Sequence, residues 1–72
     1  MADNVYVVSE IVGTSTESVD DAIRQAVARA SKTVRNLDWF VVNEIRGHID
    51  GQSVAHVQVT MKVGFRLDEP AT

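Results

Sequence analysis

The chain has 72 residues, of which 44% are hydrophobic and 24% are charged, and its formal net charge is −3. This length indicates one domain, residues 1–72, and the composition is that of a soluble globular protein. The absence of cysteine excludes disulfides and thiolate metal sites. The acidic balance argues against nucleic acid as a partner, because binding to its backbone depends on a basic surface.

No apolar run approaches the roughly 20 residues of a membrane span, and the N-terminal MADNVYVV lacks the features of a signal peptide. We therefore expect no membrane partner and a cytoplasmic location. A chain this short buries only about 60% of the surface that it exposes when unfolded. Because disulfides are excluded and the two histidines have no further ligands clustered with them, we expect copies of the chain to stabilise one another.

The first expected element is a strand from Asn4 to Val12, rich in valine and isoleucine. Neither of its two faces is cleanly polar, so both are expected to be partly buried. Gly13 is expected to end this strand, and the residues that follow it, 14–16, are expected to form a loop.

A single helix is expected to begin after Ser18, whose side chain fits an N-cap, with acidic residues in the favourable first turn. Its apolar positions follow the three-four spacing of one stripe: Val19, Ala22, Ile23, Ala26, Val27, Ala30 and Val34. Asn36 is expected to be the left-handed residue that closes the helix, with Leu37 making the apolar contact that accompanies such a cap.

Two further strands are expected after the helix, Trp39–Arg46 and Ser53–Leu67. Residues 47–52 contain Asp50-Gly51, which is typical of a turn, and are expected to form a hairpin loop of several residues. The last strand alternates strictly, with apolar residues at odd numbers and mostly polar residues at even numbers, including His56, Gln58 and Arg66. Residues 68–72 are expected to be a flexible polar tail.

The element order is therefore β-α-β-β, an α+β fold. A strand, a crossover helix and a returning strand run parallel, whereas a hairpin pairs its strands antiparallel. Placing the long third strand in the middle makes every pairing antiparallel. We therefore expect a three-stranded antiparallel sheet in the order 1-3-2, packed on one helix through the odd-numbered residues of the third strand.

One helix can cover only one face of this sheet. Trp39 and Phe40 are neighbours and point to opposite faces, so one of them has no partner within a single copy. Exposed apolar groups of this kind mark interfaces or ligand grooves. A β-bulge between Trp39 and Arg46 would exchange the faces of the second strand, so the facing of its residues stays open.

Catalysis is poorly supported, and we expect no enzyme activity. The chain has no cysteine nucleophile, no serine in a glycine-rich elbow and no glycine-rich phosphate loop. His48 and His56 are eight positions apart, which is not a helical metal-ligand spacing, and we expect no metal site. The carboxylates near the helix start are best explained as capping and dipole residues.

Binding of a flat heterocycle is better supported. An indole at Trp39 can stack on an aromatic ring, and the amide of Gln58 on the adjacent strand can donate and accept hydrogen bonds at its polar edge. Arg46 and Arg66 can bind a phosphate through their planar guanidinium groups. The alternative is that Trp39 only packs in the core or an interface, while the arginines are solvated or paired with carboxylates.

Several blocks of the sequence resemble the dodecin family, especially its bacterial branch, in both order and spacing. These blocks are Val12–Ser15, Asn36–Phe40, Glu44–Gly47 and Val63–Leu67. The resemblance extends over almost the whole chain. It implies a small β-α-β-β subunit that assembles into a hollow, spherical homododecamer and binds flavins, stacked in pairs between tryptophans of two-fold-related subunits.

The resemblance also implies residue roles. Trp39 would stack on the flavin, Gln58 would contact the isoalloxazine edge, and Arg46 and Arg66 would lie near the ligand. Bacterial members favour FMN, so we expect FMN here, with riboflavin or FAD as the alternatives. Some bacterial members also hold coenzyme A, whose phosphates could be bound by the basic face of the expected helix, formed by Arg29, Lys32 and Arg35; the alternative is that this face is only solvated.

The function implied by the resemblance is flavin storage and protection, because an indole stacked on a flavin quenches its excited state. The alternative is an oligomeric shell that binds coenzyme A or has a purely structural role, without a physiological flavin. A flavin-dependent enzyme is the third possibility, and no residue of the sequence supports it.

Overall fold

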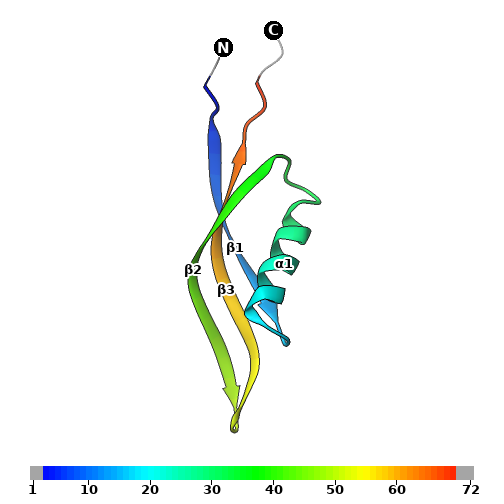
Figure 1. Ribbon diagram of the computed structural model, residues 1–72, viewed down its shortest axis with the longest axis vertical. Coiled ribbons are helices and arrows are strands. Elements are labelled where there is room, and N and C mark those ends of the chain that lie inside the picture. The colour runs from blue at the N-terminus through cyan, green and yellow to red at the C-terminus, as the bar shows by residue number, and fades with distance from the viewer. Residues whose placement is uncertain (1–2, 70–72) are drawn as a thin grey trace.

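A computed structural model describes residues 3–69 of the chain. It contains three strands and one helix, namely β1 (Tyr6–Ser15), α1 (Val19–Ala30), β2 (Leu37–Asp50) and β3 (Ser53–Arg66). The strands form one sheet in the order β1-β3-β2, with both pairings antiparallel, which confirms the predicted fold class and strand order. In Figure 1 α1 lies on one side of the sheet, and the β2–β3 turn projects at the opposite end from the start of β1 and the end of β3.

The core lies between α1 and the odd-numbered residues of β3, as predicted. Val59 and Met61 have no exposed surface, and Val63 and Ala22 complete the buried cluster. The helix packs mainly on β1 and β3. Because only these four hydrophobic residues are buried among those the structure describes, the core of one copy is small.

The first strand begins two residues later and ends three residues later than predicted, because Gly13 lies inside it and does not end it. A β-carbon at Gly13 would collide with the carbonyl of Ala22 and lie 2.8 Å from the β-carbon of Ala26. Glycine at this point therefore lets the helix approach the strand closely, which is a different use of glycine from breaking a strand.

The helix begins as predicted, since the side chain of Ser18 accepts a hydrogen bond from the backbone N–H of Asp21. It ends at Ala30, about one turn earlier than the apolar stripe suggested. Asn36 does have the expected left-handed backbone, with φ 65°, but it leads into β2 and does not cap the helix.

The β2–β3 hairpin is longer and tighter than predicted. Residues 47–50 continue β2, so the expected loop of several residues is wrong. Only Gly51 and Gln52 form the turn, and Gly51 has the positive φ of 66° that favours glycine. The result is a two-stranded ribbon that extends past Ser15, where the pairing of β1 ends.

Two register shifts near the start of β2 decide which way its side chains face. They lie between Leu37 and Trp39 and between Val42 and Glu44. Because the shift between Val42 and Glu44 exchanges the faces of the strand, Trp39 and Arg46 come to the same face although their numbers differ in parity. This settles the facing that the sequence left open.

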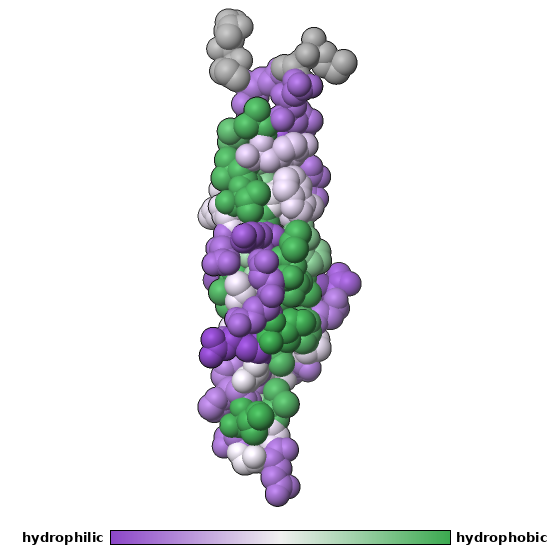
Figure 2. All heavy atoms as spheres, turned by 90° about the vertical axis from the view of Figure 1, so that its left-hand side faces the viewer, coloured by the Kyte–Doolittle hydropathy of each residue, from purple (hydrophilic) through white to green (hydrophobic). Residues whose placement is uncertain are grey.

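The described chain is elongated, with extents of 59 × 20 × 13 Å. Its radius of gyration is 15.4 Å, whereas a compact chain of this length would have about 11 Å. Figure 2 shows hydrophobic surface in several separate patches along one side. Large apolar side chains exposed along the chain include Val8, Val12, Phe40, Val41, Ile45, Ile49 and Val54. No helix among the described residues has the length and apolar character needed to cross a membrane.

Candidate functional site

The face of the sheet that α1 leaves uncovered carries all four residues predicted to bind a ligand. We call it the open face; it consists of the even-numbered β3 residues from His56 to Arg66 and their ladder partners. Directly opposed residues of antiparallel strands point to the same side. Trp39 is the partner of Gly64, and Arg46 is the partner of Gln58. The four predicted residues therefore share one surface.

Trp39 lies across β3 at its C-terminal end. The ring atoms Cζ2, Cε2 and Cη2 are the atoms nearest to the position that a β-carbon of Gly64 would occupy. On the far side of β3 the ring of Tyr6 meets the indole edge to face, with centroids 5.1 Å apart and planes at 67°. Trp39 nevertheless keeps 41% of its surface exposed. The indole is thus supported from below and from one side while remaining open to a stacking partner.

Arg66 lies at the same end, with a well-fixed backbone. Its N–H donates to the carbonyl of Asn36 at 3.1 Å, and its carbonyl accepts from the side-chain amide of Asn36 at 3.0 Å. Its ladder partner on β1 is Tyr6, which places its side chain beside the Tyr6–Trp39 pair. Asp68, a possible partner, forms its ion pair with Arg35 at 3.3 Å. Arg66 makes no ion pair within the described chain and can bind a ligand anion.

Gln58 and Arg46 form a second pair toward the hairpin end of the open face. Gln58 is half-buried between Arg46 on β2 and Thr14 on β1, its two ladder partners. Arg46 is exposed and, like Arg66, has no ion-pair partner in residues 3–69. An amide and a guanidinium side by side can bind a polar, anionic group.

The two pairs do not meet within one chain. Gly64, beneath Trp39, and Gln58 are six positions apart on β3, which corresponds to about 20 Å of strand. The sequence-based expectation that the indole lies beside the amide is therefore wrong for a single copy. The two side chains are apart because of the strand register, which pairs Trp39 with Gly64 near one end of β3 and Arg46 with Gln58 nearer the other.

Sequence reasoning missed two residues of this surface, Tyr6 and Gly64. Tyr6 was assigned only to a strand, since nothing local indicates that it meets Trp39 across β3. Gly64 did carry a signal, because a glycine inside an alternating strand often marks a close approach of another group. Here that group is the indole.

The acidic residues at the start of α1 have a structural role, as predicted. Ser15, buried beneath them, donates to Asp21 at 2.6 Å and accepts from the backbone N–H groups of Glu17 and Ser18. The hydroxyl of Ser15 and then the amide of Gln25 lower the pKa of Asp21 below its ordinary value. Such a carboxylate stabilises the turn and is unsuited to take up a proton near neutral pH.

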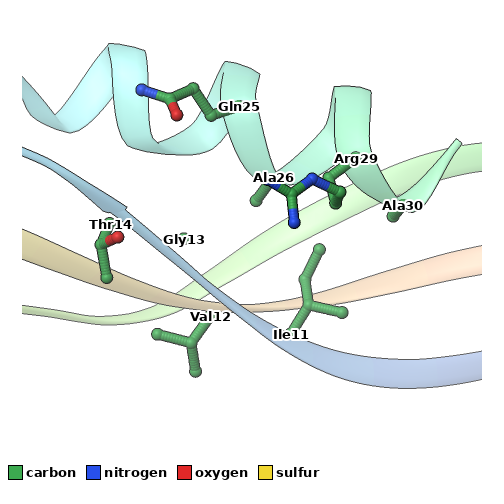
Figure 3. A pocket seen from close by; sticks show the side chains of 8 residues that line it. All are labelled: Ile11, Val12, Gly13, Thr14, Gln25, Ala26, Arg29 and Ala30. Atoms are coloured by element: carbon green, nitrogen blue, oxygen red, sulfur yellow. The ribbon is translucent and has the colours of Figure 1, made fainter. Parts of the chain in front are cut away.

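A groove of about 280 Å³ separates the outer edge of β1 from α1. Figure 3 shows Ile11, Val12 and Thr14 on the strand side and Gln25 and Arg29 on the helix side. Of the three basic residues considered for coenzyme A, Arg29 lines this groove. The other two, Lys32 and Arg35, follow the end of the helix, so the three do not form one helical face.

Comparison with known proteins gives consistent results. A family model described as Dodecin matches residues 5–68. The dodecin of Thermus thermophilus is 55% identical over 65 residues, which cover 90% of this chain and 94% of that protein. The solved dodecin of Streptomyces davaonensis matches with a TM-score of 0.90 and 59% identity, covering 94% of this chain and 100% of the other. The solved dodecin of Streptomyces coelicolor matches with a TM-score of 0.90 and 54% identity, covering 97% of this chain and 100% of the other.

Solved structures of the T. thermophilus dodecin include three single-residue variants. One changes a tryptophan to phenylalanine, and two change an arginine to alanine. The numbers of these positions in that protein are each one lower than those of Trp39, Arg46 and Arg66 here. From the family model and from relatives that match over nearly their full length, we conclude that this chain belongs to the dodecin family.

Proposed function

We propose that the protein is a flavin-binding protein that stores flavin and quenches its excited state in a hollow homododecamer, without turnover. FMN is the preferred ligand, with riboflavin and FAD as alternatives. The observation that carries this proposal is the indole of Trp39, held on Gly64 and against Tyr6 and yet 41% exposed on an uncovered face. A rigid aromatic surface presented in this way suits a flat, three-ring ligand.

Stacking on an indole is expected to quench the excited state of a flavin. Tryptophan is an electron-rich ring, and close stacking lets an electron pass to an excited flavin faster than the flavin can emit light or react with oxygen. The residues proposed to contact the ligand are a stacking ring, an amide and two arginines, and none of these side chains is an ordinary general acid or base. These residues support binding and protection, and they give no support to an enzyme.

The separation of the two residue pairs supports a site shared between copies. One flavin cannot contact both Trp39 and Gln58 of the same chain, because about 20 Å of β3 separates Gln58 from Gly64. In the proposed assembly, one copy therefore supplies Trp39 and Arg66, and a neighbouring copy supplies Gln58 and Arg46. The small core, the elongated shape and the exposed apolar side chains of one copy support the same conclusion.

The substituted T. thermophilus dodecins add support for the residues involved. Their altered tryptophan and arginines correspond in number to three of the four residues proposed here, once the offset of one is applied. By analogy, we assign stacking to Trp39 and contacts with the ribityl phosphate to Arg46 and Arg66.

A fluorescence titration tests this proposal. FMN added to the purified protein should lose its emission as it binds, and Trp39→Ala should abolish both binding and quenching. Trp39→Phe is the matched variant, which keeps a stacking ring but is a poorer electron donor, so it should retain weak binding with less quenching. Light scattering should give the same particle mass for all three proteins. Unquenched FMN fluorescence at saturating concentrations of the wild-type protein would overturn the proposal.

The alternative is a shell that binds coenzyme A or has only a structural role. The groove beside Arg29 is remote from Trp39 and offers room for part of such a ligand. Titration of flavin-free protein with coenzyme A separates the two: binding that Arg29→Ala weakens and Trp39→Ala leaves intact, together with negligible affinity for FMN, would favour the alternative.

A further inference from the structure

The β2–β3 hairpin brings the two histidines of the chain together. His48 and His56 are direct partners in the β2–β3 ladder, so both imidazoles lie on the same side of the ribbon. Their ring centroids are 5.6 Å apart, and the ring planes differ by 22°. A spacing of eight residues does not suit a helical metal site, but the tight turn at Gly51 and Gln52 converts it into a cross-strand pair.

The separation of the two stacked rings is close to that of two imidazoles on one metal ion. Imidazole nitrogens bind divalent zinc at about 2.0–2.1 Å. Since each ring centre lies little more than one bond length beyond its nitrogen, two imidazoles on one tetrahedral ion have centres about 5 Å apart. The backbone spacing therefore allows a shared ion, which requires the two stacked rings to rotate about their side-chain torsions until one nitrogen of each points to it.

Both imidazoles are available for this role. His48 is exposed and His56 is half-buried, and neither forms an ion pair within the described residues. Their backbones are fixed in the ladder, and the carbonyl of His56 lies 3.2 Å from the position of a β-carbon on Gly47. A pair held on paired strands loses little freedom when it binds an ion.

We propose that His48 and His56 of one hairpin bind a divalent transition-metal ion of the zinc, nickel and copper class through one nitrogen each. Imidazole is a preferred ligand for these ions, unlike the oxygen ligands that magnesium and calcium require. No third His, Cys, Asp or Glu joins the pair among residues 3–69, so water occupies the remaining positions.

Charges along the ribbon partly offset one another around this pair. Arg46, two residues before His48, disfavours a cation, whereas Asp50, two residues after it, favours one. The site is thus a weak, exchangeable one and differs from a structural zinc site, which has four protein ligands. It lies two residues along the strands from Arg46 and Gln58, so it is tested in flavin-free protein, where its failure would leave the flavin proposal unaffected.

Calorimetric titration of the flavin-free full chain with zinc chloride tests the site. We expect one ion per chain in a buffer that does not bind metals. His48→Gln and His56→Gln should each lower the affinity roughly tenfold or more, and the double variant should lose the site. Ser53→Ala, on the same ribbon, is the matched control and should bind as the wild type does. Unchanged zinc affinity in the double variant would overturn the proposal.

X-ray absorption at the zinc edge provides a second measurement that needs no substitution. In the wild-type protein saturated with zinc and freed of unbound metal, it should count two imidazole nitrogens and further oxygen ligands on each zinc. A spectrum without imidazole would overturn the site. Four imidazoles on each zinc, with half an ion per chain, would overturn the single-hairpin arrangement in favour of a bridge between copies. These outcomes remain decisive even if the histidine variants fail to assemble.

Discussion

The indole of Trp39 rests against the α-carbon of Gly64, its ladder partner on β3. Any β-carbon at this position would collide with the ring. Because Gly64 has no side chain, the indole can lie low across the strand and meet Tyr6 on the other side. Gly64 therefore sets the height and orientation of the stacking surface and belongs to the proposed flavin site as much as Trp39 does.

Replacing Gly64 with alanine should displace the indole. Overpacking of this kind costs about 1–3 kcal/mol, so Gly64→Ala should destabilise the protein and weaken FMN binding by about tenfold. Trp39 is the single tryptophan of the chain, so its emission spectrum reports the displacement directly. Urea unfolding and FMN titration at one chain concentration provide the other two measurements.

A double-mutant cycle separates a clash with the indole from a general effect on β3. In a Trp39→Ala background, Gly64→Ala should cost little further stability, because the group that it strikes has been removed. An equal cost in both backgrounds would show that Gly64 serves the strand backbone and not the indole.

The arginines should distinguish FMN from riboflavin. Both lie on the open face without ion-pair partners in the part of the chain described, and a hydrogen bond to a charged group contributes about 1.5–3 kcal/mol. Arg66→Ala and Arg46→Ala should each weaken FMN binding by about tenfold or more. Riboflavin, which has no phosphate, should be affected much less. Titrations with both flavins measure this ratio.

Arg24→Ala provides the matched control for these two variants. It removes the same charge, but Arg24 lies on α1, where it pairs with Asp20 at 2.8 Å, away from the open face. FMN affinity should stay close to that of the wild type. If Arg24→Ala weakened FMN binding as much as Arg66→Ala, the effect would be one of net charge and not of a phosphate contact.

The topology could be predicted from the sequence because it follows from strong periodic signals. The alternation of apolar and polar residues in β3 indicated a central strand with one buried face, and the apolar stripe of α1 indicated a single helix that covers this face. Given a crossover helix followed by a hairpin, the order 1-3-2 is the arrangement that pairs every strand antiparallel. The inference that one face remains uncovered required nothing more.

The details that arrange the site could not be predicted, because they depend on register. The shift at Asn43 brings Trp39 and Arg46 to one face, and no local pattern marks it. The distance between Trp39 and Gln58 depends on the same pairing. Gly13 was predicted to end a strand, and Gly64 signals only that some group approaches closely; which group each glycine admits depends on the three-dimensional packing.

Gly13→Ala tests the close approach of the helix. The added methyl would meet the carbonyl of Ala22 and the side chain of Ala26, and both lie on a helix that must move as a unit. We expect a loss of about 1–3 kcal/mol in the free energy of unfolding. Thr14→Ala, at the next position on the opposite face, should change stability by less than about 0.5 kcal/mol. A neutral Gly13→Ala would mean that the helix packs more loosely than described.

The hydroxyl of Ser15 should link stability to pH. It is the largest cause of the lowered pKa of Asp21, ahead of Gln25. A carboxyl whose pKa is lower in the folded than in the unfolded chain stabilises the fold above its unfolded value of 3.8, and this contribution is lost as the pH falls through the folded pKa. Ser15→Ala should raise the folded pKa toward the ordinary value and remove part of that contribution.

The cost of Ser15→Ala should therefore be larger at pH 7 than at pH 3. At neutral pH the variant loses the hydrogen bond to a charged Asp21 as well as those from the N–H groups of Glu17 and Ser18. At pH 3 the first of these losses shrinks, because Asp21 is increasingly protonated. Urea unfolding at both values and one chain concentration measures the difference, with Ser9→Ala on the same face of β1 as the control. A cost that stayed constant or grew at pH 3 would show that Ser15 acts on the backbone turn alone.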